Sequence, residues 1–88
     1  MSDTVLIELA ATIRARRSAP AEASYTRSLL DAGIARCAKK FGEEAVETVM
    51  AAVGQDEDAL KGEAADALFH LLVLLESRNV AIEDVLAV

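Results

Sequence analysis

The sequence predicts an all-α protein, a compact bundle of about five helices. Alanine, leucine and valine dominate an apolar fraction of 53%, and only 3% of the residues are aromatic, a composition that favours packed helices over strands. Apolar residues recur at helical spacing, and no segment shows the alternation that is typical of a strand. We therefore expect the 88 residues to form one helical domain, residues 1–88.

The ends of the first two helices are marked by residues that cap helices. Ser2 or Asp3 is expected to begin a first helix that runs to about Arg16. Ser24 is placed to cap a short second helix, and Gly33 suits the left-handed conformation that closes a helix.

Two long helices and one short helix are expected in the remainder of the chain. The third helix should cover residues 34–53 and the fourth residues 57–78, with Asp56 as the cap between them and Asn79 as the closing residue. A last short helix should include Ile82, Val85 and Leu86.

The charge and the distribution of apolar residues exclude several kinds of partner. A net charge of −6 disfavours nucleic acid and anionic membranes, which bind clustered basic residues. The longest apolar tract, residues 67–75, is too short to span a bilayer. The N-terminus does not resemble a secretory signal, and the single cysteine, Cys37, gives no disulfide framework. We expect a soluble cytoplasmic protein in which Cys37 is a small apolar helix residue.

One face of the third helix carries three carboxylates, Glu43, Glu44 and Glu47. At about 100° per residue they share one arc, and Lys40 and Arg36 lie on the same arc one and two turns earlier, respectively. The opposite side is apolar. Cations above a carboxylate cluster suit a phosphate chain held between positive side chains and a metal. Taken alone, however, this face is more often simply a solvated helix surface.

The fourth helix carries a second acidic stripe, formed by Glu63 and Asp66 with His70 one turn beyond them. Because most other positions on this helix are apolar, we expect a buried central helix. Burying an unpaired carboxylate costs several kcal/mol unless it is paired or binds a metal. If the two stripes face each other, an oxygen-only site for Mg²⁺ or Mn²⁺ results, and metal-assisted hydrolysis of a phosphoanhydride is the chemistry that follows.

A di-iron carboxylate bundle is an alternative that also uses acidic helices. It requires Glu-x-x-His pairs on two helices, and this chain has a single histidine. His70 by itself is more often a hydrogen-bonded bundle residue than a metal ligand.

Three segments resemble the phosphoribosyl-ATP pyrophosphohydrolase family, which belongs to the wider MazG-type group of all-α nucleoside triphosphate pyrophosphohydrolases. They are SYT at residues 24–26 with the two leucines that follow, KFGEEAVE at residues 40–47 and EAADALFH at residues 63–70. The resemblance implies a MazG-like fold completed by dimerisation. It also implies magnesium-dependent hydrolysis of phosphoribosyl-ATP to phosphoribosyl-AMP and pyrophosphate, the second step of histidine biosynthesis.

The resemblance also implies roles for single residues. The expected metal ligands are Glu44, Glu47, Glu63 and Asp66. Glu43 is expected to activate water or to support the ligands, and the expected substrate-binding residues are Lys40, Arg36, Ser24 and Tyr25. For Ser24, a role as a helix cap is an equal alternative. Phe69 stands where the family commonly has tyrosine, and Ala67 where it commonly has leucine.

Two other functions remain open from the sequence. One is a house-cleaning pyrophosphohydrolase of the same superfamily that acts on canonical or damaged deoxynucleotides. The other is a dimerising helical module without enzyme activity, whose acidic faces only keep it soluble.

Overall fold

The computed structural model describes residues 4–20 and 24–88, and this part of the chain contains helices and no strand. The first helix, α1, covers Thr4–Ala15 and continues as a 3-10 turn over Arg16–Ser18. The others are α2 (Tyr25–Ala32), α3 (Ile34–Gly54), α4 (Glu57–Ser77) and α5 (Ile82–Leu86). The prediction of an all-α bundle of about five helices is confirmed.

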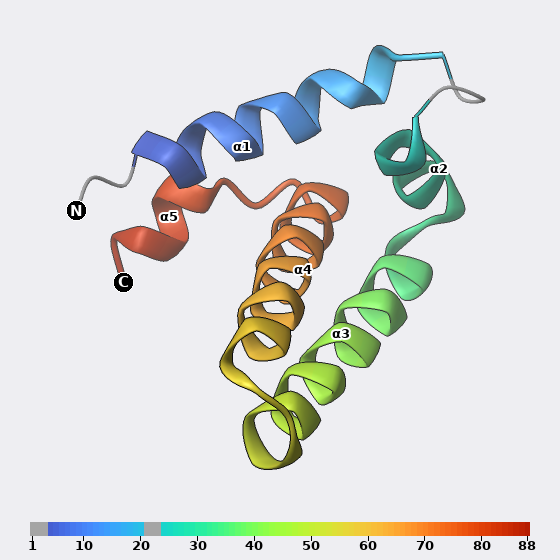
Figure 1. Cartoon of the computed structure of the whole chain (residues 1–88). Helices are drawn as coiled ribbons and strands as arrows, with labels where there is room; N and C mark the ends of the chain where they lie inside the picture. Colours follow the sequence, from blue (N-terminus) through green and yellow to red (C-terminus); the bar gives the residue numbers. More distant parts are fainter. Residues whose placement is uncertain (1–3, 21–23) are drawn as a thin grey trace.

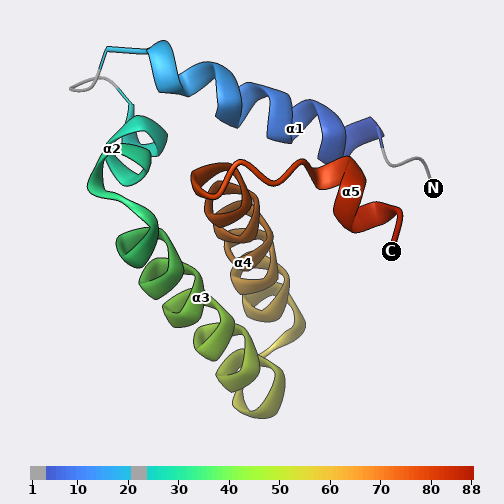
Figure 2. The ribbon, with the colours of Figure 1, turned by 180° about the vertical axis from the view of Figure 1, so that it is seen from behind.

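The two long helices, α3 and α4, form an antiparallel hairpin that projects from the rest of the molecule (Figure 1). The other helices gather at the open end of this hairpin. There α1 crosses the C-terminal end of α4, α5 packs against α1, and α2 leads into α3, as the view from behind also shows (Figure 2). None of the described helices is both long and apolar enough to cross a membrane.

The helix ends are held by the residues predicted to cap them. The Ser24 hydroxyl accepts a hydrogen bond from the Arg27 backbone N–H at 3.1 Å, and the Asp56 carboxylate accepts one from Ala59 at 2.8 Å. Gly33 separates α2 from α3 with the predicted positive φ, 101°, but its ψ of 173° is extended and differs from the left-handed helical conformation that was expected; Asn79 has φ of 59° after α4. The predicted cap at Ser2 or Asp3 lies outside the described residues.

The core lies where the helices meet at the open end of the hairpin, and every helix contributes to it. Its buried residues are Ile13, Leu29, Cys37, Leu72, Val73 and Ile82. Cys37 is 1% exposed and its thiol donates a hydrogen bond to the Leu29 carbonyl at 3.2 Å. Cys37 is therefore a core residue, as expected.

The expectation of a buried central helix holds only for the C-terminal half of α4. Its buried residues, His70, Leu72, Val73 and Glu76, all lie in its C-terminal half, and Asp66 is exposed. The reason is the position of the other helices. They cover only the C-terminal half of α4, so that among the described helices α3 alone lies beside the N-terminal half (Figure 1).

Candidate metal centre

The two acidic stripes meet between α3 and α4. Glu44 of α3 and Glu63 and Asp66 of α4 each offer a carboxylate oxygen, and these oxygens lie within 4.8 Å of one another. The antiparallel hairpin causes this convergence, because it places the middle of α3 beside the first half of α4. Three of the four predicted metal ligands are thus brought together.

The fourth predicted ligand, Glu47, lies close enough to affect the same cluster. The pKa of Glu63 is raised, first because its carboxyl group is partly buried and then because Glu47, Glu44 and Asp66 add negative charge around it. Glu63 Oε2 is also buried, and no described residue forms a hydrogen bond with it. Close carboxylates with an unpartnered oxygen form a site that a cation stabilises, and oxygen-only donors fit Mg²⁺ or Mn²⁺.

Lys40 is the positive group nearest to this cluster. Its Nζ lies 3.3 Å from Glu44 Oε1 and 4.0 Å from Glu43 Oε1. The pKa of Lys40 is raised, chiefly by its hydrogen bond with Glu44. Arg36 is exposed one turn earlier on α3. The predicted arrangement of cations above carboxylates is therefore present for Lys40.

The remaining predicted catalytic residue, Glu43, lies beside the cluster on an open hollow. The hollow has a volume of about 540 Å³ and is lined by Gly42, Glu43, Val46, Glu47 and Met50. It joins the acidic edge of α3 to its exposed apolar face. Glu43 and Glu47 are both exposed there, so solvent reaches the carboxylate expected to act on water.

An aromatic contact between α4 and the start of α2 lies next to the site. The His70 and Tyr25 rings lie edge to face, with centroids 5.9 Å apart and an interplanar angle of 84°. His70 also contacts Phe69, at 5.0 Å and 75°. Burial lowers the pKa of His70, with Lys40 adding to the effect while Glu44 and Asp66 oppose it. The sequence did not predict this contact, because three aromatic residues in the whole chain are too few to form a pattern that would reveal which rings meet.

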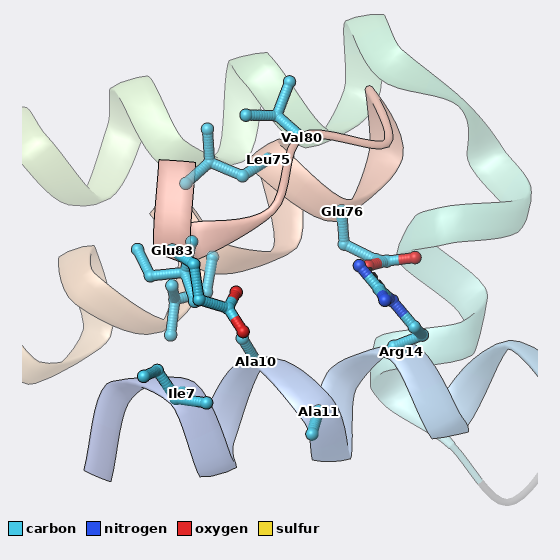
Figure 3. A pocket seen from close by; sticks show the side chains of 10 residues that line it. Ile7, Ala10, Ala11, Arg14, Leu75, Glu76, Val80 and Glu83 are labelled. Carbon is cyan, nitrogen blue, oxygen red and sulfur yellow. Dashed lines mark hydrogen bonds and ion pairs between the residues drawn. The ribbon is translucent and has the colours of Figure 1, made fainter. Parts of the chain in front are cut away.

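A second charged cluster, which sequence reasoning also missed, lies at the far end of α4. The Glu76 side chain is buried and accepts hydrogen bonds from Arg17 and from Arg14, the latter at 3.2 Å. Arg17 also donates to the Glu76 carbonyl at 2.5 Å. Glu76 and Arg14 border a cavity of about 80 Å³ between α1, α4 and α5 (Figure 3). The cavity contains none of the predicted site residues.

Comparison with known proteins agrees with the resemblance seen in the motifs. The family model for phosphoribosyl-ATP pyrophosphohydrolase matches residues 6–88. The "Phosphoribosyl-ATP pyrophosphatase" of Nitrobacter hamburgensis is 59% identical over 78 residues, which cover 89% of this chain and 73% of that protein. The "Phosphoribosyl-ATP pyrophosphatase 1" of Rhodopseudomonas palustris is 56% identical over 85 residues, which cover 97% of this chain and 79% of the relative. The chain belongs to the phosphoribosyl-ATP pyrophosphohydrolase family.

Proposed function

We propose that this chain hydrolyses phosphoribosyl-ATP between its α and β phosphates, giving phosphoribosyl-AMP and pyrophosphate in the second step of histidine biosynthesis. The observation that carries the proposal is the convergence of Glu44, Glu63 and Asp66 within 4.8 Å in a member of this family. A triphosphate substrate needs such a site, because its charge must be neutralised before water can attack phosphorus.

The proposed metal ligands are Glu44, Glu47, Glu63 and Asp66, and the proposed ion is Mg²⁺. The clustered oxygens and the unpartnered Glu63 Oε2 support this assignment. When bound, Mg²⁺ would neutralise phosphate charge and lower the pKa of a coordinated water. The exposed Glu43 is proposed to accept the proton that the attacking water loses.

The proposed substrate-binding residues surround this cluster. Lys40 and Arg36 supply ammonium and guanidinium donors for phosphate oxygens on the same side of α3. Tyr25 and Ser24 lie at the start of α2, and the Tyr25 phenol is close enough to influence the pKa of Lys40. A nucleotide could thus contact α2, α3 and α4 together.

We further propose that two copies of the chain form a homodimer. The accessible surface of 5786 Å² exceeds the roughly 5,000 Å² expected for a folded monomer of 9.3 kDa. The excess is close to the roughly 800 Å² that each partner buries in a standard interface. Exposed apolar residues gather on the hairpin: Val46, Val49, Met50, Val53 and Leu68. A partner copy covering them would explain both observations. The cytoplasmic location stays a prediction.

Pyrophosphate release tests the proposed function directly. With Mg²⁺ and phosphoribosyl-ATP, the purified chain should release pyrophosphate, and Asp66→Asn and Glu44→Gln should abolish turnover while retaining the fold. Glu57→Gln, an exposed carboxylate at the start of α4, is the matched control and should stay active. Higher kcat/KM on deoxynucleoside triphosphates than on phosphoribosyl-ATP would overturn the substrate assignment.

Mg²⁺ should also raise the melting temperature of the wild type and not that of Asp66→Asn.

A further inference from the structure

His70 is a buried polar residue, and one of its ring nitrogens lacks a hydrogen-bond partner among the described residues. It is 6% exposed, and its Nδ1 is buried without a hydrogen-bond partner among the described residues. Such an atom costs stability that an apolar side chain would not. Its ring, however, makes two edge-to-face contacts, with Tyr25 of α2 and with its neighbour Phe69. Within the described part of the chain, these ring contacts, and not hydrogen bonds of the imidazole, are therefore the interactions that His70 makes at this position.

The contact with Tyr25 connects His70 to the candidate site. His70 follows Asp66 by one turn of α4, so its ring lies on the same stripe as the acidic cluster. Tyr25 is 54% exposed although its ring contacts the ring of His70, so the residue both packs against α4 and faces solvent. Lys40 pairs with Glu44 at 3.3 Å, and its pKa is also raised by the Tyr25 phenol, so Tyr25 is near enough to Lys40 to interact with its charge.

The His70 ring supports the exposed ring of Tyr25 at the edge of the acidic cluster. An edge-to-face partner restricts the tilt of an aromatic ring, and the backbone at the start of α2 is held by the Ser24 cap and by Arg27, which donates to the Ala19 carbonyl. An exposed ring held in one orientation offers a flat apolar surface to a nucleobase, and rings used in this way contribute to binding through stacking. The cations and carboxylates beside it would hold the phosphates of the same nucleotide.

We propose that His70 is a positioning residue that holds the Tyr25 ring at the edge of the acidic cluster, and that the purine base of the substrate packs on Tyr25. The inference rests on the proposed function, because it takes a purine nucleotide as the ligand. His70 acts through Tyr25 and does not itself touch the reacting atoms.

The chain provides its own reporter for this contact, since Tyr25 is the one tyrosine in the sequence and there is no tryptophan. His70→Leu removes the supporting ring, and His70→Phe retains one. We expect acrylamide to quench the Tyr25 fluorescence more strongly in His70→Leu than in the wild type, and equally in His70→Phe. In time-resolved measurements with Mg²⁺, AMP should shorten the Tyr25 lifetime, and His70→Leu should need roughly tenfold more AMP.

Kinetics of the Mg²⁺-loaded protein provide the second readout. Tyr25→Leu and His70→Leu should each raise KM by roughly tenfold with kcat within about threefold, and the double variant should be no worse than Tyr25→Leu alone. Ile13→Val, a core change on α1 away from Tyr25, controls for lost stability and should leave KM unchanged. His70→Phe should restore KM.

The outcomes separate this inference from the function on which it rests. If the wild type released no pyrophosphate, the proposed function would fail, while the fluorescence of Tyr25 would still report whether His70 holds it. If the wild type were active but the two single effects on KM simply multiplied, or quenching were the same in His70→Leu and the wild type, the positioning role would be wrong. The Tyr25→Leu variant keeps the test valid even if His70→Phe overpacks its site.

Discussion

At the scale of single residues, Glu76 shows how a buried charge is made tolerable. Glu76 is 7% exposed, and burial alone would raise its pKa. The guanidinium groups of Arg17 and Arg14 outweigh that effect, so the pKa of Glu76 is lowered. The two arginine side chains stay 41% and 64% exposed, which leaves their charges hydrated. We name this arrangement, Arg14 and Arg17 on Glu76, the arginine clamp.

Replacing Glu76 by Gln should lower the free energy of unfolding at pH 7 by about 1–2 kcal/mol, the range for a charge-assisted hydrogen-bond network whose partners are partly exposed. A carboxyl group with a lowered folded-state pKa stabilises the fold above its unfolded pKa of about 4.3, and that contribution disappears as the pH falls through the folded value. Urea titrations between pH 3 and 7 should therefore show a weaker acid dependence in Glu76→Gln.

Glu83→Gln is the control for the arginine clamp. Glu83 is an exposed carboxylate on the same cavity (Figure 3). Its replacement should change stability by less than about 0.5 kcal/mol. Equal losses in Glu83→Gln and Glu76→Gln would show that the clamp contributes nothing specific.

His70 should make the metal-free fold sensitive to pH in a different range. Its folded-state pKa lies below the unfolded value of about 6.5, so the fold is most stable above pH 6.5 and loses up to about 1.4 kcal/mol per pH unit as the pH falls towards the folded value. Because the raised pKa of Glu63 acts in the opposite direction, the quantity to measure is the difference between wild-type and His70→Gln melting curves from pH 7.5 to 5. A pH-independent difference would contradict this prediction.

The sequence predicted the carboxylates of the site but not the residues that support them. Glu44, Glu63 and Asp66 could be found because each lies on a helix face whose pattern is local, and the hairpin needs only a short turn to bring the faces together. Glu76 pairs with arginines that are 59 and 62 residues away. No local pattern records such a pairing, since it depends on where α1 crosses α4.

At the scale of elements, Gly33 is the joint between α2 and α3. Its φ of 101° and ψ of 173° lie in a region that is nearly restricted to glycine. The joint redirects the chain so that Tyr25 and Lys40, on successive helices, approach the same part of α4. The sequence predicted this break because a glycine stands between two apolar periodic segments.

Gly33→Ala should destabilise the fold by about 1–3 kcal/mol, because a Cβ is strained at this φ whatever space surrounds it. Gly62→Ala is the matched control, since Gly62 lies within α4 and a Cβ added to it would meet nothing within 4 Å. That change should stabilise the helix by about 0.5–1 kcal/mol. Chemical denaturation of both variants checks the prediction, and a neutral Gly33→Ala would show that the joint is not strained.

Helix bounds were predicted well and helix burial was not, for one physical reason. Caps such as Ser24 and Asp56 act within a few residues, so they can be recognised in the sequence. Burial depends on neighbours. The apolar residues of α4 indicated a helix covered on all sides, but Leu68 is 51% exposed in the single chain because α1, α2 and α5 reach only the other half of α4.

At the scale of the whole molecule, the chain is more extended than its length requires. Its radius of gyration is 13.6 Å, against roughly 12 Å for a compact domain of 88 residues. The projecting hairpin causes the difference, and it carries several of the large apolar residues that the single chain leaves exposed, among them Val49, Met50 and Leu68. Its apolar face borders Glu43 and Glu47 through the open hollow.

If a second copy covers this face, Met50→Glu should separate the dimer. Met50 is 61% exposed, and a charge buried there in an interface would be costly. Light scattering coupled to size exclusion should give the dimer mass for the wild type and the monomer mass for Met50→Glu. Thr12→Glu, with the same charge change on exposed α1, should stay dimeric. A monomeric wild type would contradict the homodimer.

The arginine clamp also sets an order of events in folding. The α3–α4 hairpin closes through a short turn, whereas docking α1 requires the ends of a loop of about 60 residues to meet, at a larger cost in chain entropy. We therefore expect α1 to join an already formed hairpin and to leave it first. In native-state hydrogen exchange, the amides of α1 should exchange through a partial opening that Glu76→Gln makes easier, while the buried C-terminal half of α4 exchanges only on global unfolding.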